Sequence, residues 1–342
     1  MSSRYELLRA VVALVLFSVA GGLTGANAQQ IYELKASVYT PPSNPLARAM
    51  EQWASIIKDK SKGRLIIKVF PGGQMGPPPR QFDLVRSGVA DLAIVLHGLT
   101  PGRFPLTELA HVPGVLPSNG YVSSLALSDV WANLSKSDHP GVKVLNVLAI
   151  IPMPIISRTE LTKWADLRGK RVRAAGSVQS DVLQAMGAVP ILVQPGDLND
   201  ALDKGMIEAA SIGYSGIASY HLTDAGKFVS EGELGGVTFA TVMNESAFKK
   251  LPGDLQKLLD ESSRGEGARL FARILAEDES AYRAKLNAQG IRVSTLSSDA
   301  SLQDATIKIK ADAIKRAKAA GFDAEGVLAK LRAALEKYKN AK

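Results

Sequence analysis

A helix–glycine–acid–strand pattern occurs twice in the chain and constrains its fold more than any other feature. Residues 83–91 (DLVRSGVAD) align with residues 200–208 (DALDKGMIE). In each copy a helical pattern ends at a glycine, two residues and an acid follow, and a short apolar strand begins. A strand that ends in Pro-Gly precedes each copy, at 71–72 and 195–196. The shared order, spacing and breakers predict two α/β units of similar build, with coincidence between common α/β patterns as the alternative.

Apolar spacing around each copy predicts alternating strands and helices. Asn44 stands before Pro45, a good first-turn residue, so Asn44 is expected to cap the first helix. Such alternation is typical of parallel strands joined by crossover helices, so the fold class is α/β. The expected strands are 31–39, 65–70 and 91–96 in the first unit and 171–174, 189–193 and 207–212 in the second.

The first 28 residues have the pattern of a secretory signal peptide. Arg4 and Arg9 precede an apolar run at 10–20, and Ala26-Asn27-Ala28 supplies small residues for cleavage before Gln29. The alternative is a membrane anchor, but the apolar run is shorter than the roughly 20 residues that span a bilayer. We therefore expect export and a periplasmic location.

Composition narrows the classes of function. The chain contains no cysteine, which excludes disulfides and thiol chemistry, and its hydrophobic fraction of 46% is ample for a core. The formal net charge is +8, and much of it lies between Lys308 and Lys342. There Lys and Arg alternate with Ala and Leu, which favours a solvated helix face over the alternative of a nucleic-acid patch.

Ligands of open parallel sheets bind beyond the carboxyl ends of the strands, so two facing units can share one cleft there. Arg173 ends a strand before small residues, and its planar guanidinium fits a carboxylate with two hydrogen bonds. The alternatives are a surface arginine at 173, a buried structural histidine at 97 and a core tyrosine at 214. The candidate ligand-binding residues are Arg173, His97, Tyr39, Tyr214, Ser211 and Phe239.

Signatures of catalysis are missing from the sequence. It has no HExxH zinc motif, no GxGxxG dinucleotide turn and no GxxxxGK[ST] phosphate loop. The four histidines show no metal-ligand spacing. We therefore expect neither enzyme activity nor a metal or cofactor.

Several segments resemble the solute-binding subunits of tripartite ATP-independent periplasmic (TRAP) transporters. Individually they are weak, but their order and spacing together are fairly specific. The segments are 70–76 (FPGGQMG), 84–93 (LVRSGVADLA), 101–106 (PGRFPL), 167–173 (LRGKRVR), 186–190 (MGAVP) and 242–245 (VMNE).

The resemblance implies a two-domain periplasmic binding protein fold of type II-like build, with an interdomain cleft and a long domain-spanning helix at 257–288. It implies capture of a small organic acid by hinge closure, with Arg173 on its carboxylate, and delivery to the membrane permease subunits. Domain I is expected at 29–150 plus 238–278 and domain II at 151–237 plus 279–342, in a monomer that binds no nucleic acid.

The chain departs from the family pattern in two places. Residues 208–213 (EAASIG) stand where many members have a run like DGQENP, and the second ligand-binding arginine of sialic-acid-binding members would fall near Pro152 and is absent. Two other functions therefore stay open. One is a ligand-sensing binding protein for a small polar or amino-alcohol solute, and the other is an exported hydrolase that uses Ser215.

Overall fold

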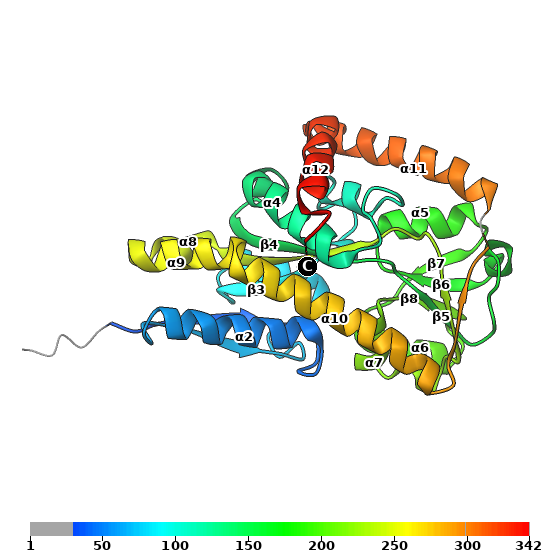
Figure 1. Ribbon diagram of the computed structural model, residues 1–342, viewed down its shortest axis with the longest axis horizontal. Helices are drawn as coiled ribbons and strands as arrows, with labels where there is room; N and C mark the ends of the chain where they lie inside the picture. Colours follow the sequence, from blue (N-terminus) through cyan, green and yellow to red (C-terminus); the bar gives the residue numbers. More distant parts are fainter. Residues whose placement is uncertain (1–29, 298, 342) are drawn as a thin grey trace, which may run out of the picture.

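The computed structural model describes residues 30–297 and 299–341, and the expected leader at 1–28 lies outside them. The described chain forms two α/β lobes, each built on its own sheet (Figure 1). The first sheet has the order β2-β1-β3-β10-β4 and the second the order β11-β9-β5-β8-β6-β7. This architecture confirms the α/β class and the type II-like binding-protein fold.

The first sheet is mostly parallel at one edge and antiparallel at the other. β1 runs parallel to β2 and β3, whereas β10 runs antiparallel to β3 and β4. Strand β10 follows β5 to β9 of the second sheet in the chain, so the chain returns from the second lobe to the first at β10. The strands are β1 (Tyr32–Ser37), β2 (Leu65–Phe70), β3 (Leu92–Leu96), β4 (Val142–Ile150) and β10 (Val237–Asn244).

The second sheet repeats this mixed arrangement. β6 runs parallel to β7 and β8, while β5 runs antiparallel to β8 and β9. Its strands are β5 (Ile155–Ser157), β6 (Arg171–Ala174), β7 (Val189–Leu192), β8 (Ala209–Ser211), β9 (Phe228–Glu231) and β11 (Arg292–Thr295).

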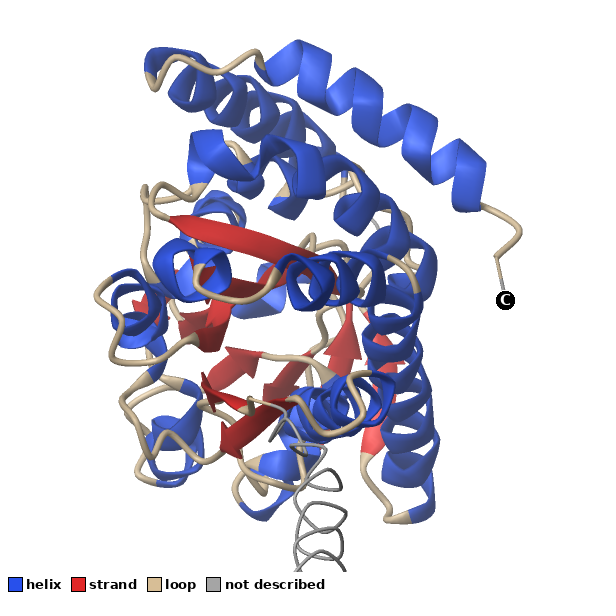
Figure 2. Cartoon of the chain, turned by 90° about the vertical axis from the view of Figure 1, so that its left-hand side faces the viewer, coloured by secondary structure: helices blue, strands red, loops and turns tan. Residues whose placement is uncertain are grey.

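Helices surround the two sheets (Figure 2). Asn44 caps the first of them as expected, since its side chain accepts a hydrogen bond of 3.0 Å from the N–H of Leu46. The helices are α2 (Pro45–Lys60), α3 (Gln81–Arg86), α4 (Gly120–Asp138), α5 (Ser177–Ala185), α6 (Leu198–Asp203), α7 (Tyr214–Ser219), α8 (Glu245–Lys249), α9 (Gly253–Arg264), α10 (Glu266–Ala288), α11 (Ala300–Ala319) and α12 (Ala324–Tyr338).

The sequence repeat has the same hydrogen bonds in both lobes. The N–H of Lys35 in β1 donates to Asp91 Oδ2 at 2.7 Å, and the N–H of Arg171 in β6 donates to Glu208 Oε2 at 2.7 Å. In return, the N–H of each acid donates to the carbonyl of the same partner at 2.9 Å. The repeated acid thus fixes each strand against its neighbour, which makes coincidence untenable.

A glycine is required before each of these acids. Gly88 and Gly205 have φ values of +77° and +67°, a left-handed conformation that costs other residues energy. Each ends its helix, α3 or α6, and turns the chain into the next strand. The sequence pattern therefore reflects a backbone requirement.

Strand β3 is buried on both faces, which explains its unbroken apolar sequence. Leu92, Ile94 and Leu96 face a core formed with α2, α9 and α10. Ala93 and Val95 face the opposite core, which includes α4 and continues into the second lobe through residues of β6 and α5. The first sheet is thus a central layer between two cores.

The long helix expected at 257–288 is two helices, which corrects that prediction. α9 ends at Arg264 and α10 starts at Glu266, because Gly265 has φ −94° and ψ −98°. Gly267 packs so closely on Trp53 that a Cβ there would lie 2.8 Å from the indole nitrogen. The non-helical backbone at Gly265 thus ends one helix, and the next helix starts against Trp53 of α2. α10 still spans both lobes, since it contacts α2 and α4 of the first and α7 of the second (Figure 1).

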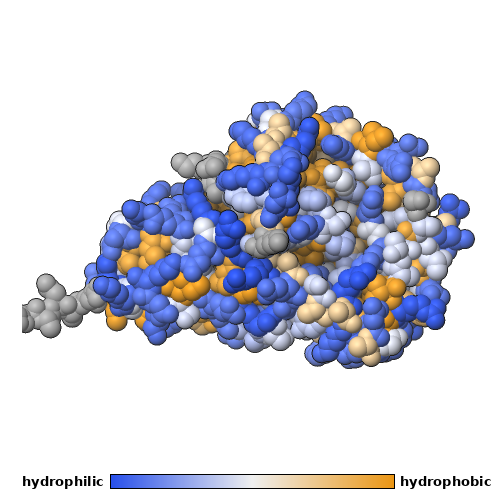
Figure 3. Space-filling model, viewed as in Figure 1, coloured by the Kyte–Doolittle hydropathy of each residue, from blue (hydrophilic) through white to orange (hydrophobic). Residues whose placement is uncertain are grey.

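The last two helices pack on different lobes. α11 contacts α5, and α12 contacts α4. The division of the chain into domains at 29–150 plus 238–278 and 151–237 plus 279–342 stays a prediction. Among the helices described, none is long and apolar enough to cross a bilayer. The face in Figure 3 is largely hydrophilic, with apolar groups in separate small patches.

Candidate functional site

Arg173 is a buried cation, and no acid among the described residues forms an ion pair with it. It lies in β6 and is 1% exposed. Its Nε donates to the carbonyl of Val193 at 3.2 Å and its Nη1 donates to the carbonyl of Ser211. Its Nη2 is buried and has no hydrogen-bond partner among the described residues. An unpaired buried cation is costly, so this nitrogen is free to bind an anion.

The pKa of Arg173 also reflects a buried positive charge that is incompletely compensated. Burial lowers the pKa of Arg173 to about 10, while the nearby phenols of Tyr39 and Tyr220 act in the opposite direction. Burial also raises the pKa of both tyrosines, so both stay neutral near pH 7. A neutral phenol is a hydrogen-bond donor, and two of them beside a guanidinium suit a carboxylate.

Arg173 lines a small cavity between the lobes, with a volume of about 50 Å³. The first lobe contributes residues that follow β1 and residues of α2, β3, β4 and β10, and the second contributes residues of β6, η5 (Pro195–Asp197) and α7. The cavity is lined by Tyr39, Thr40, Asn44, Leu46, Leu96, Ile150, Met153, Arg173, Ala175, Pro195, Ile212, Gly213, Ser215, Gly216, Tyr220 and Val237.

The cavity is small because the lobes meet directly. A Cβ at Gly98, just after β3, would lie 2.0 Å from the carbonyl oxygen of Ala175, just after β6. Asn44 Nδ2 donates to Ser219 Oγ across the gap at 3.0 Å. Small-molecule pockets are roughly 300–1,000 Å³, so a ligand of several heavy atoms requires the lobes to move apart.

Two predicted site residues lie at this cavity and a third supports it. Arg173 and Tyr39 line it. Ser211 does not line it, but its carbonyl accepts the Arg173 hydrogen bond, and its own hydroxyl is buried without a partner among the described residues.

His97 lies elsewhere, in a buried histidine cluster of the first lobe. Its Nδ1 is 2.8 Å from Thr238 Oγ1 and its Nε2 is 2.9 Å from His139 Nε2. His111 Nε2 is 2.7 Å from the same hydroxyl. Burial lowers the pKa of His97, and it brings His111 to about 4 and His139 to about 3. His97 is thus a satisfied core histidine, the alternative reading of its sequence position.

Tyr214 and Phe239 also lie away from the Arg173 cavity. The hydroxyl of Tyr214 donates to Glu231 Oε1, and Tyr214 lines a separate pocket of about 310 Å³ on the other side of α7. Phe239 is paired in β10 between Leu96 and Leu148 and packs in the first-lobe core. The equivalent positions 97 and 214 of the repeat thus have different environments, since His97 contacts His139 and Tyr214 contacts Glu231.

Other cavity residues were absent from the predicted site. Thr40 and Ser215 lie a few residues after β1 and β8, so the expectation that ligands bind beyond the ends of strands also applies to them. Asn44 was expected only as a helix cap, yet the same side chain also crosses to the second lobe. Tyr220 follows α7, and no feature of the sequence marks it.

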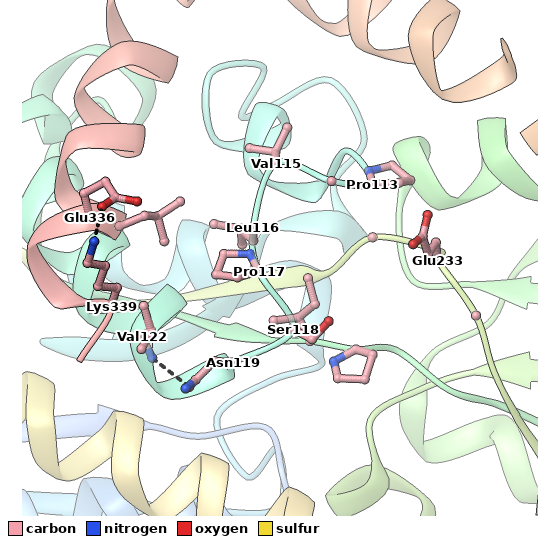
Figure 4. A pocket seen from close by; sticks show the side chains of 16 residues that line it. Pro113, Val115, Leu116, Pro117, Ser118, Asn119, Val122, Glu233, Glu336 and Lys339 are labelled. Carbon is pink, nitrogen blue, oxygen red and sulfur yellow. Dashed lines mark hydrogen bonds and ion pairs between the residues drawn. The ribbon is translucent and has the colours of Figure 1, made fainter. Parts of the chain in front are cut away.

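A larger hollow of about 560 Å³ lies between residues 113–119 and the end of α12 (Figure 4). Its charged groups include Glu336 and Lys339, which pair with each other at 2.8 Å. These charges are already compensated and exposed, unlike Arg173. The chemistry therefore favours the smaller cavity, although the hollow has more space.

Comparison with known proteins identifies the family. Residues 36–315 match the family model described as bacterial extracellular solute-binding protein, family 7 (DctP). The chain belongs to this family. The DctP match confirms the resemblance to TRAP solute-binding subunits that the sequence segments indicated.

Among curated DctP-like relatives, a solute-binding protein of Albidiferax ferrireducens is 22% identical over 216 residues, or 62% of this chain and 64% of the relative's length. The 2,3-diketo-L-gulonate-binding periplasmic protein of Escherichia coli is 23% identical over 292 residues, or 84% of this chain and 88% of its own.

Solved TRAP solute-binding proteins share the fold over nearly the whole chain. One from a marine metagenome, in complex with 3-hydroxybenzoate, has a TM-score of 0.84 and 26% identity, and covers 91% of this chain and 100% of its own. Another from Bordetella bronchiseptica, with bound mandelate, has a TM-score of 0.83 and 26% identity, and covers 90% and 99%.

Proposed function

We propose that this protein captures a small organic acid between its lobes, with Arg173 on the carboxylate, and delivers it to the membrane subunits of a TRAP transporter. The observation that carries the proposal is the unpaired Nη2 of a buried guanidinium at the interlobe cavity. A carboxylate that moves in from water would supply the missing partner. Charge-assisted hydrogen bonds of this kind contribute roughly 1.5–3 kcal/mol each.

The other lining residues favour an acid with an apolar body. Seven aliphatic or thioether residues line the cavity: Leu46, Leu96, Ile150, Met153, Ala175, Ile212 and Val237. Arg173 is the only cationic residue among the lining residues, so there is one site for one carboxylate. The relatives with bound 3-hydroxybenzoate and mandelate support the same class, aromatic or similarly apolar monocarboxylates.

Neither alternative function finds comparable support at the cavity. The buried guanidinium of Arg173 would repel an amino-alcohol cation, and the described lining residues include no Asp or Glu to compensate its charge. A Ser-His-acid hydrolase needs a histidine beside Ser215, and the described lining residues include none. The Ser215 hydroxyl donates instead to Glu279, whose carboxylate is already occupied by the N–H groups of Tyr214 and Ser215. We infer a binding protein that carries out no reaction.

Export through a leader at 1–28 and function as a periplasmic monomer belong to the same proposal. The family is extracellular, which supports this location. N-terminal sequencing of protein recovered from a periplasmic fraction tests it, with Gln29 as the expected first residue. A mature chain that begins at Met1 would contradict export by cleavage.

A ligand screen tests the proposed function. We expect benzoate, 3-hydroxybenzoate or mandelate to raise the melting temperature by a few degrees at about 100-fold excess over Kd, where binding adds roughly 2.7 kcal/mol. Benzamide, which has the shape of benzoate without its charge, is the matched control and should give no shift. Ethanolamine and succinate report the amino-alcohol and dicarboxylate alternatives. A panel in which no acid stabilises the protein would refute the proposal.

A further inference from the structure

Two neighbouring acids on α10 hold the two lobes. Asp278 pairs with Arg48 of α2, which belongs to the first lobe. Glu279 accepts hydrogen bonds from α7 of the second lobe: from the N–H of Tyr214 at 2.6 Å, from the N–H of Ser215 at 3.0 Å, and from the Ser215 hydroxyl. α10 lies between these helices, so one turn of one helix contacts both (Figure 1).

Glu279 matters because α7 carries part of the candidate ligand site. Gly213, Ser215 and Gly216 line the Arg173 cavity, and Tyr220 lines it just after α7 ends. A helix of six residues is too short to be stable alone, and the N–H groups of its first turn lack partners within it. Glu279 supplies that partner, so the location of α7 depends on this carboxylate.

The approach of Glu279 to α7 is close and requires a glycine. A Cβ at Gly213 would lie 2.9 Å from Glu279 Oε1 and 2.7 Å from a methyl group of Ile150. Glu279 itself lines the pocket on the far side of α7, together with Arg283 and Glu231, and does not line the Arg173 cavity. Glu279 therefore affects a ligand only through the helix it holds.

We propose that Glu279 is a positioning residue for the ligand site, which sets α7 so that Ser215 and Tyr220 face the ligand held by Arg173. The proposal rests on the proposed function, because it describes one wall of the same site. Asp278 on the preceding position connects this wall to α2, whose cap Asn44 lines the opposite wall. Both walls of the cavity are thus aligned from α10.

The test compares Glu279→Gln with Glu277→Gln, a control on the same helix at an exposed position. The change at 279 keeps the size of the side chain but replaces one carboxylate oxygen by an NH2 donor, so the groups of Tyr214 or of Ser215 that donate to that oxygen lose their acceptor. We expect hydrogen exchange of the segment 213–219 to become about tenfold faster in Glu279→Gln without ligand. Calorimetry should show about tenfold weaker benzoate binding, and the control should stay within twofold of the wild type in both measurements.

Each outcome decides the proposal. Unchanged exchange in 213–219 would show that Glu279 does not hold α7, and faster exchange with unchanged benzoate affinity would show a purely structural role. A double mutant with Ser215→Ala adds a second readout, since coupled residues give a loss of affinity smaller than the sum of the single losses. The wild type is measured first, so a wild type that binds no acid refutes the proposed function and not the hold of Glu279 on α7.

Discussion

The two copies of the repeat have the same backbone and different side-chain chemistry. In each lobe an acid accepts the N–H of a residue in the neighbouring strand of the sheet, Lys35 of β1 in the first and Arg171 of β6 in the second. Two residues further along these strands, the first lobe has Ser37 and the second has Arg173. Both ring nitrogens of His97 have partners inside the first lobe, whereas Nη2 of Arg173 has no hydrogen-bond partner in the part of the chain that the structure describes. The repeat therefore supplies the frame, and single residues decide which lobe binds the anion.

The largest expected effect removes the cation from the second lobe. Arg173→Ala should weaken benzoate binding at least a hundredfold, because a buried carboxylate left without its partner costs roughly 3–5 kcal/mol. Arg173→Lys should also weaken it, since an ammonium cannot reproduce the planar fork. The melting temperature without ligand should change little, because the lost hydrogen bonds to the carbonyls of Val193 and Ser211 are offset by the removal of a buried charge that no described acid pairs. Calorimetry and thermal melts measure both, with exposed Arg168→Ala as the control.

Equal benzoate affinity in Arg173→Ala and wild type would remove the asymmetry between the lobes. The anion would then be recognised by the phenols or by another group, and the buried guanidinium would need a different explanation.

A second prediction concerns the place where the strand ends of the two copies touch. Gly98→Ala should hold the lobes apart, because its Cβ would lie 2.0 Å from the carbonyl oxygen of Ala175. We expect about tenfold weaker benzoate binding and a larger radius of gyration at saturating benzoate. Gly253→Ala, at a site with open space around the added Cβ, is the control. Tight binding by Gly98→Ala would show that closure does not require this contact.

The smallest expected effect concerns the pH dependence of folding stability, which we expect to arise from the buried histidines of the first lobe. The pKa of His111 is about 4 and that of His139 about 3 in the fold, both below the ordinary 6.5, so their contribution to stability is present above pH 6.5 and lost as the pH falls. Asp138, with a pKa raised to about 6 by burial, acts in the opposite sense and favours the fold at low pH. The histidines outnumber it, so stability should fall between pH 6 and pH 4.

The quantity to measure is the slope of the free energy of unfolding against pH. His111→Gln should flatten it by about 1.4 kcal/mol per pH unit, because one buried histidine no longer has to take up a proton. Arg173→Ala in the other lobe should leave the slope unchanged. Urea melts between pH 4 and pH 7 give the comparison, and an unaltered slope in His111→Gln would mean that the cluster does not titrate on unfolding.

The fold was largely readable from the sequence because its signals are local. The glycine that ends each helix, the acid that follows and the cap at Asn44 all act on backbone within a few residues. The break at Gly265 differs from the predicted single helix, because one glycine inside a helical pattern is usually tolerated and does not by itself mark a helix end.

The candidate site was readable only in part for a similar reason. Strand ends indicate which residues can reach the cleft, and this rule places Arg173 and Tyr39 at the cavity. It does not give the direction of a side chain, so His97 and Tyr214 were expected at a cleft from which they turn away. Tyr220 and Glu279 act through α7 and α10, whose meeting is a long-range contact without a sequence signal.

The shape of α10 has a mechanical consequence. Its 23 residues form a helix about 34 Å long at 1.5 Å per residue. The first lobe contacts it at Asp278 and the second lobe at Glu279, both near its centre. If α10 rotated by about 10° around its centre, each end of the helix would move by about 3 Å, because each end lies about 17 Å from the centre. The chain contains no cysteine, so a single cysteine introduced at either end of α10 could be labelled selectively. The label would then report the movement of that end of the helix.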